Sequence, residues 1–371
     1  MTLMKAVRLF EHGGLDALAY GDFPLPDIGP ADLLVRVLAT SVSRWDVKYR
    51  IGEVKGGGLP GRRRFPLPMQ PGRDAAGVVE RVGEQVRAFK PGDRVVGLVH
   101  PANPLSPLTI RGLGNLSTDI DYPGHTMFGG NAQYVARPES YWLPLPDGVE
   151  PAAAAAAMWS YATAHRILTD RLAARLGDAV LVVGGSGGMG SATLDLARAM
   201  GLRVVAVTRS AAKAGFLRER GATEVVVLPR DDAAAAIRGM ANAAGANAPG
   251  ADASGAGLLG LDGAVDYSGD PAMLRLCVDV LRPGGTVVLV AGEGLSAPIP
   301  ITAADCIRLE LNLRGARAST LDDQRSVLAL LAQKRISPAI DAVLPLSEVR
   351  AAHARLEAGE VAGRIVLDPW R

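Results

Sequence analysis

The sequence predicts an α/β protein in which a β-rich N-terminal domain is followed by a doubly wound parallel sheet. Its 371 residues are more than one ordinary core accommodates, so two domains are expected. Up to residue 145, short apolar runs alternate with Gly and Pro turns, which is typical of β-strands. From Pro151 onward, apolar runs alternate with helical patterns, as in a parallel sheet with helical crossovers.

The same patterns place the elements along the chain. In the N-terminal domain, strands are expected at 33–38, 77–82 and 93–99. An alanine-rich helix is expected from 152 to 168, and the sheet strands follow at 179–183, 203–207, 225–228, 264–267, 286–291 and 311–315. Crossover helices are expected at 191–200 and 211–220, and the stretch 239–263 is interpreted as a surface loop because it lacks periodicity. The C-terminal part is expected to form helices at 321–334 and 346–358 and a strand at 364–367.

Composition excludes several classes of protein. A net charge of +2 does not indicate a nucleic-acid surface. No run of eighteen apolar residues occurs and the N-terminus lacks the apolar segment of a signal peptide, so no membrane span is expected and the cytoplasm is the expected location. Cys277 and Cys306 are too few for a disulfide framework and are expected to be packing residues. The five histidines are scattered, without ligand spacing.

A glycine-rich turn follows the first expected strand of the sheet. Gly185, Gly187 and Gly190 stand in G-x-G-x-x-G register, between a buried strand and a helix. The first glycine allows a tight turn, the second lets the backbone approach a pyrophosphate, and the third permits close packing of helix on strand. This is the phosphate cradle of a Rossmann dinucleotide-binding domain. Its expected contacts are Gly185, Ser186, Gly187, Gly188, Met189 and Gly190.

The end of the second sheet strand indicates which dinucleotide is bound. Sites for NAD(H) usually carry an Asp or Glu here, which accepts hydrogen bonds from the ribose hydroxyls. This chain instead has Thr208, Arg209 and Ser210, with Lys213 nearby and no acid before Glu219. A cation flanked by hydroxyls suits a 2′-phosphate, so NADP(H) is predicted over NAD(H).

Several motifs together resemble the medium-chain dehydrogenase/reductase superfamily over nearly the whole chain. They are G-R-D-A-A-G-V-V at 72–79, V-G at 82–83, P-G-D-R-V at 91–95, G-G-N-A-Q-Y-V at 129–135, Thr163-Ala164, L-R-P-G-G at 281–285 and G-R-I-V-L at 363–367. The resemblance implies a GroES-like domain at 1–149 and 318–371 and a Rossmann domain at 150–317. It also implies an active site in the cleft between the domains, with Thr163 contacting the cofactor.

The resemblance also identifies the positions at which the zinc branch of the superfamily holds its catalytic metal. They are occupied here by Ser43, Arg73 and Trp159, and the proton-relay hydroxyl is replaced by Trp45. Zinc is bound by thiolate, imidazole or carboxylate groups, and an arginine adds a fixed positive charge. Residues 100–115 contain no cysteine for a structural zinc. No metal is therefore expected.

Without a metal Lewis acid, an alcohol is hard to ionise, whereas a conjugated alkene needs only hydrogen-bond donors on its carbonyl oxygen. The favoured hypothesis is an NADPH-dependent, zinc-independent reductase of an enone, quinone or enoyl compound, with a small-molecule substrate. Two alternatives stay open. One is a zinc-free enzyme of specialised metabolism that acts on a ketone or aldehyde, or without net redox. The other is a nucleotide-binding homologue without catalysis.

The segment that begins at Ser43 supplies several catalytic candidates. Ser43 either donates a hydrogen bond to the nicotinamide ribose or the substrate carbonyl, or is an ordinary loop serine. Asp46 is expected to hold the loop by binding backbone amides. Lys48 and Tyr49 are candidate proton donors, but a solvated lysine and a packed tyrosine are the favoured interpretations.

The other candidates are aromatic and basic. Trp45 and Trp159 are expected to narrow the cleft and contact a planar substrate, with core packing as the alternative. Arg73 either binds a substrate carbonyl or carboxylate, or pairs with Asp74 or Asp46, and the ion pair is slightly favoured. The arginines at 62–64, which follow glycines at 56–58, either meet the phosphates of a large substrate or, as favoured, belong to a solvated loop.

Two further expectations come from strand ends and edges. Ser268 and Gly269, after the fourth sheet strand, and Ala291 and Gly292, after the fifth, are expected to border the nicotinamide, because strand C-termini line the crevice of this fold. The last strand, 311–315, is expected at a sheet edge with exposed backbone groups. In the superfamily the matching strand often pairs with its twin, so a homodimer is predicted.

Overall fold

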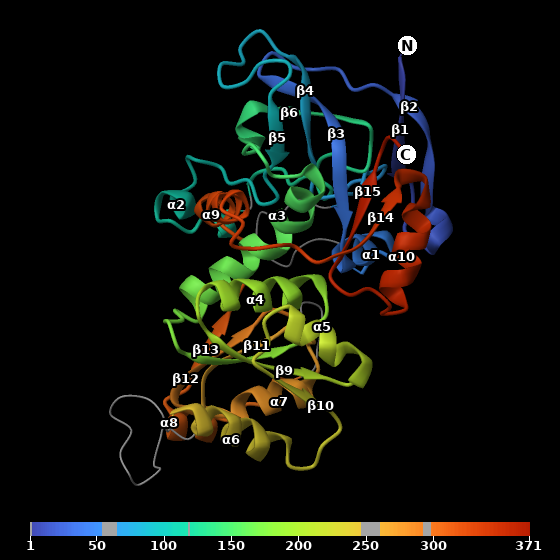
Figure 1. The fold of residues 1–371 in the computed structure, drawn as a ribbon. Coiled ribbons are helices and arrows are strands. Elements are labelled where there is room, and N and C mark those ends of the chain that lie inside the picture. Colours follow the sequence, from blue (N-terminus) through green and yellow to red (C-terminus); the bar gives the residue numbers. More distant parts are fainter. Residues whose placement is uncertain (1, 54–64, 118, 246–259, 292–297) are drawn as a thin grey trace. The chain divides into compact units, whose positions relative to one another are not determined.

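The computed structural model describes residues 2–53, 65–117, 119–245, 260–291 and 298–371, which form two compact units (Figure 1). The first unit comprises Met1–Ala162 and Ala318–Arg371, and the second comprises Thr163–Arg317. The boundary falls inside a helix, beyond the composition shift at Pro151, because that helix continues from one unit into the other. The arginines at 62–64, Gly292 and residues 246–259 of the expected loop lie outside the described residues.

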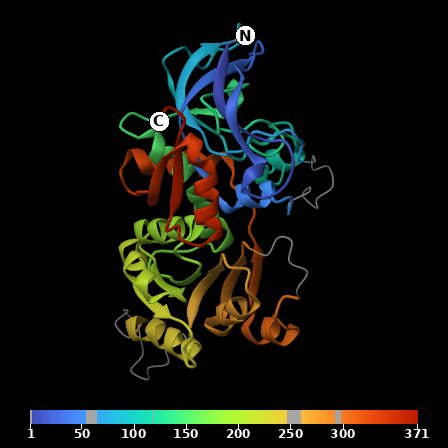
Figure 2. The ribbon, with the colours of Figure 1, turned by 90° about the vertical axis from the view of Figure 1, so that its right-hand side faces the viewer.

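The first unit is built on a mostly antiparallel sheet in the order β14-β15-β3-β4-β5-β7, with β6 paired to β3. These strands are β3 (Asp32–Val42), β4 (Ala76–Val82), β5 (Arg94–Gly97), β6 (Tyr134–Pro138), β7 (Trp142–Pro144), β14 (Ile340–Pro345) and β15 (Arg364–Asp368). A separate hairpin joins β1 (Leu3–Leu9) to β2 (Leu18–Pro24). Alternate β3 residues Leu33, Val35 and Val37 enter the core. Because β15 pairs with β3, both ends of the chain contribute to one sheet (Figure 2).

Five helices belong wholly or partly to the first unit in the described residues. They are α1 (Arg44–Arg50), α2 (Pro107–Ile110), α3 (Pro151–Arg166), α9 (Leu321–Ala332) and α10 (Val349–Glu357). Helix α10 buries Val349, Ala352 and Leu356, which share one helical face, against residues of β1, β3 and β15. This packing ties the C-terminal segment to the N-terminal strands and confirms the expected C-terminal helices and strand.

The second unit contains a six-stranded sheet in the order β10-β9-β8-β11-β12-β13, in which all neighbouring strands are parallel. Its strands are β8 (Ala179–Val183), β9 (Arg203–Thr208), β10 (Glu224–Val227), β11 (Leu261–Asp266), β12 (Leu281–Leu289) and β13 (Asn312–Gly315). The order confirms the predicted doubly wound sheet. From β8 the chain adds β9 and β10 on one side, and it then returns to add β11, β12 and β13 on the other side of β8. Sheets of this type bind ligands at the point between β8 and β11 where the strand order reverses.

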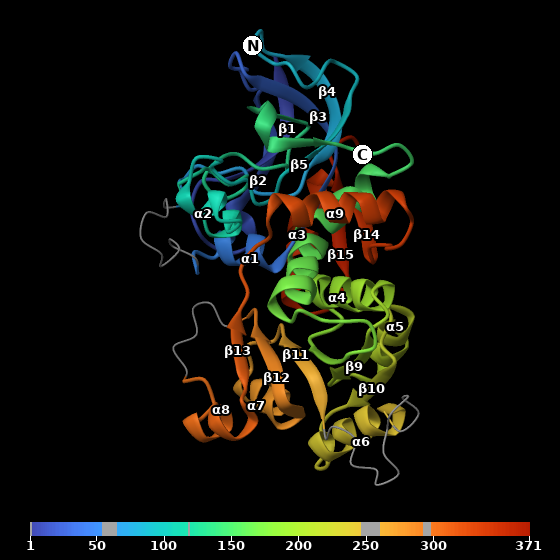
Figure 3. The same cartoon turned by 90° about the vertical axis from the view of Figure 1, so that its left-hand side faces the viewer.

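Helices cover both faces of this sheet, with α4 (Gly188–Ala199) and α5 (Ala214–Glu219) on one face and α6 (Ala233–Gly245) and α7 (Pro271–Asp279) on the other (Figures 1 and 3). Leu181 and Val183 of β8 pack with Ile237 of α6 and Leu274 of α7 in one core cluster. Because alternate residues of a strand point to opposite faces, a wholly apolar β8 is what two covered faces require.

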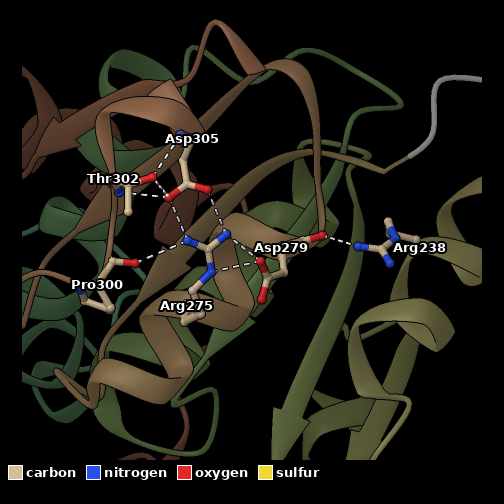
Figure 4. Close-up of polar contacts among 6 residues, drawn as sticks. All are labelled: Arg238, Arg275, Asp279, Pro300, Thr302 and Asp305. Atoms are coloured by element: carbon tan, nitrogen blue, oxygen red, sulfur yellow. Dashed lines mark hydrogen bonds and ion pairs between the residues drawn. The ribbon is translucent and has the colours of Figure 1, made fainter. Parts of the chain in front are cut away.

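Ion pairs fasten α7 to the segment that precedes β13 (Figure 4). Arg275 of α7 lies 2.5 Å from Asp279 and 2.8 Å from Asp305 of α8 (Ala303–Leu309). Arg238 of α6 donates to the backbone oxygen of Asp279. Asp305 also accepts hydrogen bonds from the backbone nitrogen and hydroxyl of Thr302, so the network links three helices on one face of the sheet.

One expectation about elements is wrong. The predicted loop 239–263 is helical in its first part, because α6 continues to Gly245, and its last part belongs to β11, which begins at Leu261. The helix passes through Gly239 because Ala233, Ile237 and Ala241, four residues apart, bury one face. Strand β14 was not predicted, since its residues are mostly half-buried and show no alternation.

Strand β13 forms one edge of the six-stranded sheet, as predicted, and pairs only with β12 among the described strands. Leu313 at its centre is 41% exposed. The homodimer expected through this edge stays a prediction. None of the described helices combines the length and the apolar character that crossing a bilayer requires.

Candidate active site

Arg73 lies in a loop that two glycines hold close to a second loop. Gly72 has a φ of +93°, and a Cβ there would meet Oδ1 of Asn131 at 2.3 Å. A Cβ on Gly129 would meet the backbone oxygen of Gly72 at 2.2 Å. Both positions therefore require glycine, which gives a structural reason for the motifs at 72–74 and 129–131. The packed loops fix the backbone from which Arg73 projects.

The guanidinium of Arg73 is buried among aromatic rings. Its Nη2 donates to the hydroxyl of Tyr49 at 2.8 Å, and its carbon lies 4.2 Å from a ring centroid of Trp159. Nη1 donates to the backbone oxygen of Val99 at 3.4 Å, and only 5% of Arg73 is exposed. In the described part of the chain no carboxylate lies within ion-pair distance, so the favoured ion pair of Arg73 is wrong. Hydrogen bonds and the cation–π contact offset part of the cost of this buried charge.

Asp74 belongs to a separate buried cluster. It forms an ion pair with Arg364 of β15 at 2.7 Å and accepts a hydrogen bond from the hydroxyl of Ser41 at 2.5 Å. It also accepts the backbone N–H of Trp159 at 3.1 Å. Burial raises the pKa of Asp74, and the charge of Arg364 opposes that rise. Asp74 thus joins β3, β15 and α3, and it positions the tryptophan on which Arg73 stacks.

Ser43 and Asp46 form the cap of α1. The hydroxyl and the backbone N–H of Ser43 donate to one oxygen of Asp46, at 2.7 and 2.8 Å. The other oxygen of Asp46 accepts the backbone N–H of Gly72 at 3.3 Å. This confirms that Asp46 holds the loop through backbone amides. The hydroxyl proton of Ser43 is used within this cap, and a contact of Ser43 with a ligand stays a prediction.

The other candidates on α1 have different surroundings. Lys48 lies 3.0 Å from Glu53 in a partly exposed ion pair, as expected for a solvated lysine. Trp45 is half-buried, with its ring centroid 5.9 Å from that of Tyr49. Tyr49 is only 3% exposed and bonds to Arg73, so it lies in the buried site and is also packed there.

The three positions of the zinc-branch ligands do not fit a zinc ion. Ser43 is bound to Asp46, and the side chain of Trp159 offers an indole ring rather than a metal ligand. Arg73 brings a cation to the place where the resemblance puts the dication. Across the described residues, no group of three or more His, Cys, Asp or Glu side chains could hold a metal ion. Neither the charge nor the donor atoms of this site suit zinc.

Three aromatic residues of this site were missed by reasoning from the sequence. The ring of His100 lies 5.4 Å from that of Trp159, and its Nδ1 is 2.9 Å from the hydroxyl of Ser319. The ring of Tyr122 lies 5.6 Å from the Arg73 guanidinium, and the ring of His125 lies 4.9 Å from that of Tyr49. All three belong to the connection between β5 and β6. The histidines there do not have the spacing of metal ligands, so the sequence gives no signal for this part of the site.

His353 of α10 is fully buried close to α1, and its ring nitrogens have no hydrogen-bond partner among the described residues. Burial lowers its pKa from 6.5 to about 4; Arg50 adds to this, while Asp46 and Glu357 oppose it. The unfolded chain therefore takes up a proton on His353 at a higher pH than the folded chain does. This group contributes stability that is present above pH 6.5 and lost as the pH falls toward 4.

We expect the free energy of unfolding of wild-type protein to fall by roughly 3 kcal/mol from this group alone between pH 7 and pH 4. In His353→Leu that part of the acid sensitivity should be absent, because no proton is taken up at this position. Urea unfolding at both pH values measures the difference. His165→Gln, at a half-exposed histidine, is the matched control for the loss of an imidazole. Equal acid sensitivity in His353→Leu and wild type would contradict the assignment.

In the second unit, the turn after β8 has the geometry of a phosphate cradle. Helix α4 begins at Gly188 with Gly187 as its N-cap. A Cβ on Gly190 would meet the backbone oxygen of Gly184 at 2.2 Å, so this glycine is required for packing of helix on strand. A Cβ on Gly187 would have no neighbour closer than 3.8 Å, which leaves space outside the turn. Backbone N–H groups at a helix N-terminus beside such space fit a pyrophosphate.

Arg209 follows β9 and is paired with an acid that the sequence did not indicate. Its guanidinium forms an ion pair with Asp270, the N-cap residue of α7, and the side chain of Arg209 is 69% exposed. The guanidinium lowers the pKa of Asp270. Because β9 and β11 flank β8, this pair bridges the strand ends on either side of the glycine-rich turn. The acid beside Arg209 therefore comes from the segment after β11 and not from the segment after β9.

The other cofactor candidates lie at strand ends, as expected, and their contacts with a cofactor stay predictions. Thr208 ends β9, and its hydroxyl accepts the backbone N–H of Ser210 at 3.1 Å. Lys213 ends the 3-10 turn Ala211–Lys213. Thr163 is buried near the end of α3, in the second unit. Gly292 lies outside the described residues.

Buried Asp266 organises the end of β11. One oxygen accepts the backbone N–H and the hydroxyl of Ser268, at 2.8 and 2.6 Å. The other accepts the N–H of Gly269 at 3.1 Å, and the backbone oxygen accepts the N–H of Ala291. Cys277, nearby on α7, is fully buried in the core, which confirms its packing role.

Fold and cradle together define a class of protein, the two-domain enzymes that bind a dinucleotide on a doubly wound sheet. Residues 29–147 match the family model of the alcohol dehydrogenase GroES-like domain, and residues 188–333 match that of the zinc-binding dehydrogenases. The chain belongs to the medium-chain dehydrogenase/reductase superfamily, whose members are nicotinamide-dependent oxidoreductases.

Relatives with different reactions are similar to this chain. An alcohol dehydrogenase of Geobacillus stearothermophilus is 26% identical and covers 95% of each chain. A quinone oxidoreductase of Lama guanicoe is 28% identical over 98% of this chain and 97% of that protein. A 2-methylene-furan-3-one reductase of Solanum lycopersicum is 27% identical over 99% of this chain and 79% of that protein.

Solved structures have the same architecture. AibC is 33% identical, with a TM-score of 0.84, and the match covers 100% of this chain and 96% of that chain. A zinc-binding dehydrogenase homologue from Sinorhizobium meliloti 1021, solved with NADP bound, is 25% identical with a TM-score of 0.80 and covers 100% of both chains.

Proposed function

We propose that this protein is an NADPH-dependent reductase that adds hydride to an activated alkene, an enone, quinone or enoyl compound, without a metal ion. The observation that carries the proposal is the buried guanidinium of Arg73, which has no carboxylate partner in the described residues. It lies where the zinc branch of the superfamily requires a metal ligand. A charge held in this way costs stability, and stabilisation of charge that develops in a reaction is a function that would offset this cost.

The second unit supplies the residues for the nucleotide. Gly187 and the N-terminus of α4 would hold the pyrophosphate. Arg209 would bind the 2′-phosphate, and its ion pair with Asp270 would then be broken. When bound, the reduced nicotinamide supplies a hydride. The solved relative that carries NADP supports this choice of nucleotide.

In the first unit, Arg73 would stabilise the negative charge that collects on a substrate carbonyl oxygen. Its fixed charge and N–H donors suit a carbonyl, an enolate or a quinone oxygen. Tyr49 accepts a hydrogen bond from Nη2, and the ring of Trp159 lies 4.2 Å from the guanidinium carbon, so both positioning residues limit the movement of Arg73. A preformed positive charge is most effective when little reorganisation accompanies the reaction.

Reduction of an activated alkene suits a site without zinc better than alcohol oxidation does. Alcohol oxidation requires ionisation to the alkoxide, which a metal promotes by lowering the alcohol pKa. An enone carries its own electron-withdrawing carbonyl, so hydride addition at its β-carbon needs only charge stabilisation at oxygen. The similar quinone oxidoreductase and 2-methylene-furan-3-one reductase support this substrate class, and the similar alcohol dehydrogenase is why aldehydes and ketones belong in the test.

The test is NADPH oxidation, followed at 340 nm, with a panel of enones, quinones, aldehydes and ketones. We expect turnover with enones or quinones and none with simple aldehydes and ketones. Turnover of aldehydes or ketones alone would favour the zinc-free alcohol dehydrogenase-like alternative. NADPH binding with no turnover of any panel member would favour a homologue without catalysis.

A further inference from the structure

A cavity of about 330 Å³ lies in the first unit, and Arg73 is not among the residues that line it. Its walls come from β1, the end of β2 and the segment after it, β6, and the loops that carry Gln70 and Phe128. None of the residues that contact the Arg73 guanidinium lines it. A volume of this size is at the lower end of pockets that bind small molecules. The residues that matter for its chemistry are Met4, Arg8, Leu25, Asp27, Gln70 and Phe128.

Arg8 is the unusual residue of this cavity. Only 7% of it is exposed, and across the described residues its side chain makes neither an ion pair nor a hydrogen bond, and its Nη1 is buried without a partner. Its guanidinium carbon lies 3.8 Å from the ring centroid of Phe128 and 5.2 Å from that of Phe23. Burial lowers the pKa of Arg8 to about 10, which still leaves it charged at neutral pH. Two aromatic faces compensate a buried cation only in part.

The rest of the wall limits what can compensate this charge. Met4, Leu25 and Phe128 are apolar, so a ligand with an apolar body fits better than an inorganic anion. Gln70 is 1% exposed, and its Oε1 has no donor within the part of the chain that the structure describes. The acid of the wall, Asp27, is exposed and forms no ion pair with Arg8 in the described structure, and its charge disfavours multiply charged anions.

We propose that this cavity binds a small organic monocarboxylate. The carboxylate of the ligand pairs with the Arg8 guanidinium, and the apolar body of the ligand contacts Phe128, Met4 and Leu25. Such a ligand supplies the counter-charge that the described residues lack at Arg8 and fills the apolar volume beside it. The site is distinct from the residues proposed for hydride transfer, so it does not depend on the proposed function.

The test uses benzoate and its neutral isostere benzamide as probes, in ligand-observed NMR titrations of the full-length protein. We expect benzoate to bind at least ten-fold more tightly than benzamide, because Arg8 requires a negative charge. In Arg8→Met, benzoate affinity should fall at least ten-fold and benzamide affinity should stay unchanged. Equal affinities of wild type for the two probes, or unchanged benzoate affinity in Arg8→Met, would overturn the proposal.

Two further variants locate the binding. Arg73→Met removes the buried guanidinium of the candidate active site and should leave benzoate affinity unchanged. Loss of binding in this variant would assign benzoate to the Arg73 site and overturn the proposal. Leu25→Trp fills the cavity without changing any charge and should abolish benzoate binding, which keeps the test decisive if Arg8→Met does not fold. Retained binding in Leu25→Trp would contradict the proposed location.

Discussion

Replacing Arg209 by Ala should weaken NADPH binding by about 10- to 100-fold and NADH binding by less than about three-fold. The physical reason is that a charge-assisted hydrogen bond to the 2′-phosphate is worth roughly 1.5–3 kcal/mol, and NADH lacks that phosphate. Arg209 is exposed and forms its ion pair at the surface, so the substitution should not disturb the core. Titrating each nucleotide against protein fluorescence gives the two dissociation constants.

Asp270→Asn is the matched variant for this prediction. Asp270 holds the guanidinium of Arg209 in the structure, and its charge repels a phosphate placed between them. Removing that charge should tighten NADPH binding and leave NADH nearly unaffected. Equal loss of both nucleotides in Arg209→Ala would contradict the assignment of Arg209 to the 2′-phosphate.

Replacing Arg73 by Met should lower kcat by about 10²- to 10³-fold, the loss typical of removing one group that stabilises developing charge. The dissociation constant for NADPH should stay unchanged, because the phosphate cradle and Arg209 belong to the second unit. Unfolding in urea should show equal or greater stability, since the variant loses a buried cation without a carboxylate partner in the described structure. Steady-state rates with an enone that the wild type reduces measure the main effect.

Two variants separate charge from packing at this position. Arg73→Lys keeps the charge without the planar fork and should retain more activity than Arg73→Met. Tyr49→Phe removes the hydroxyl that accepts from Nη2 and keeps the ring, so it should cost less than loss of the charge. A kcat within two-fold of wild type in Arg73→Met would remove Arg73 from the reaction.

The strands and the glycine-rich turn of the second unit could be predicted because their signals are local. Six apolar runs marked the six strands, and the glycine-rich turn followed the first of them, as the structure confirms. Secondary-structure elements were predicted wrongly or missed where the local sequence pattern does not reflect the packing of the element. Gly239 suggested a loop, but the helical spacing of Ala233, Ile237 and Ala241 continues across it. Strand β14 lacks alternation and depends on pairing with β15, which no local pattern reveals.

The sequence could predict which residue types belong to the candidate site, but not which side chains contact one another. These contacts join parts of the chain that are distant in sequence. Asp74 is adjacent to Arg73 in sequence, yet it pairs with Arg364 of β15. Arg209 meets Asp270 because their strands flank β8, a relation set by strand order rather than by spacing. In neither case did the sequence indicate which acid lies beside which arginine. Side-chain partners therefore had to come from the fold.

The chemistry proposed for Arg73 is tested most directly by the rate of NADPH oxidation with a cyclic enone, using protein treated with a chelator and shown by elemental analysis to hold no zinc. We expect full activity in this preparation, with the product reduced at its carbon–carbon double bond and no gain in rate on adding Zn²⁺. Activity that disappears with the metal and returns with Zn²⁺, or a product reduced at the carbonyl, would contradict the role proposed for Arg73.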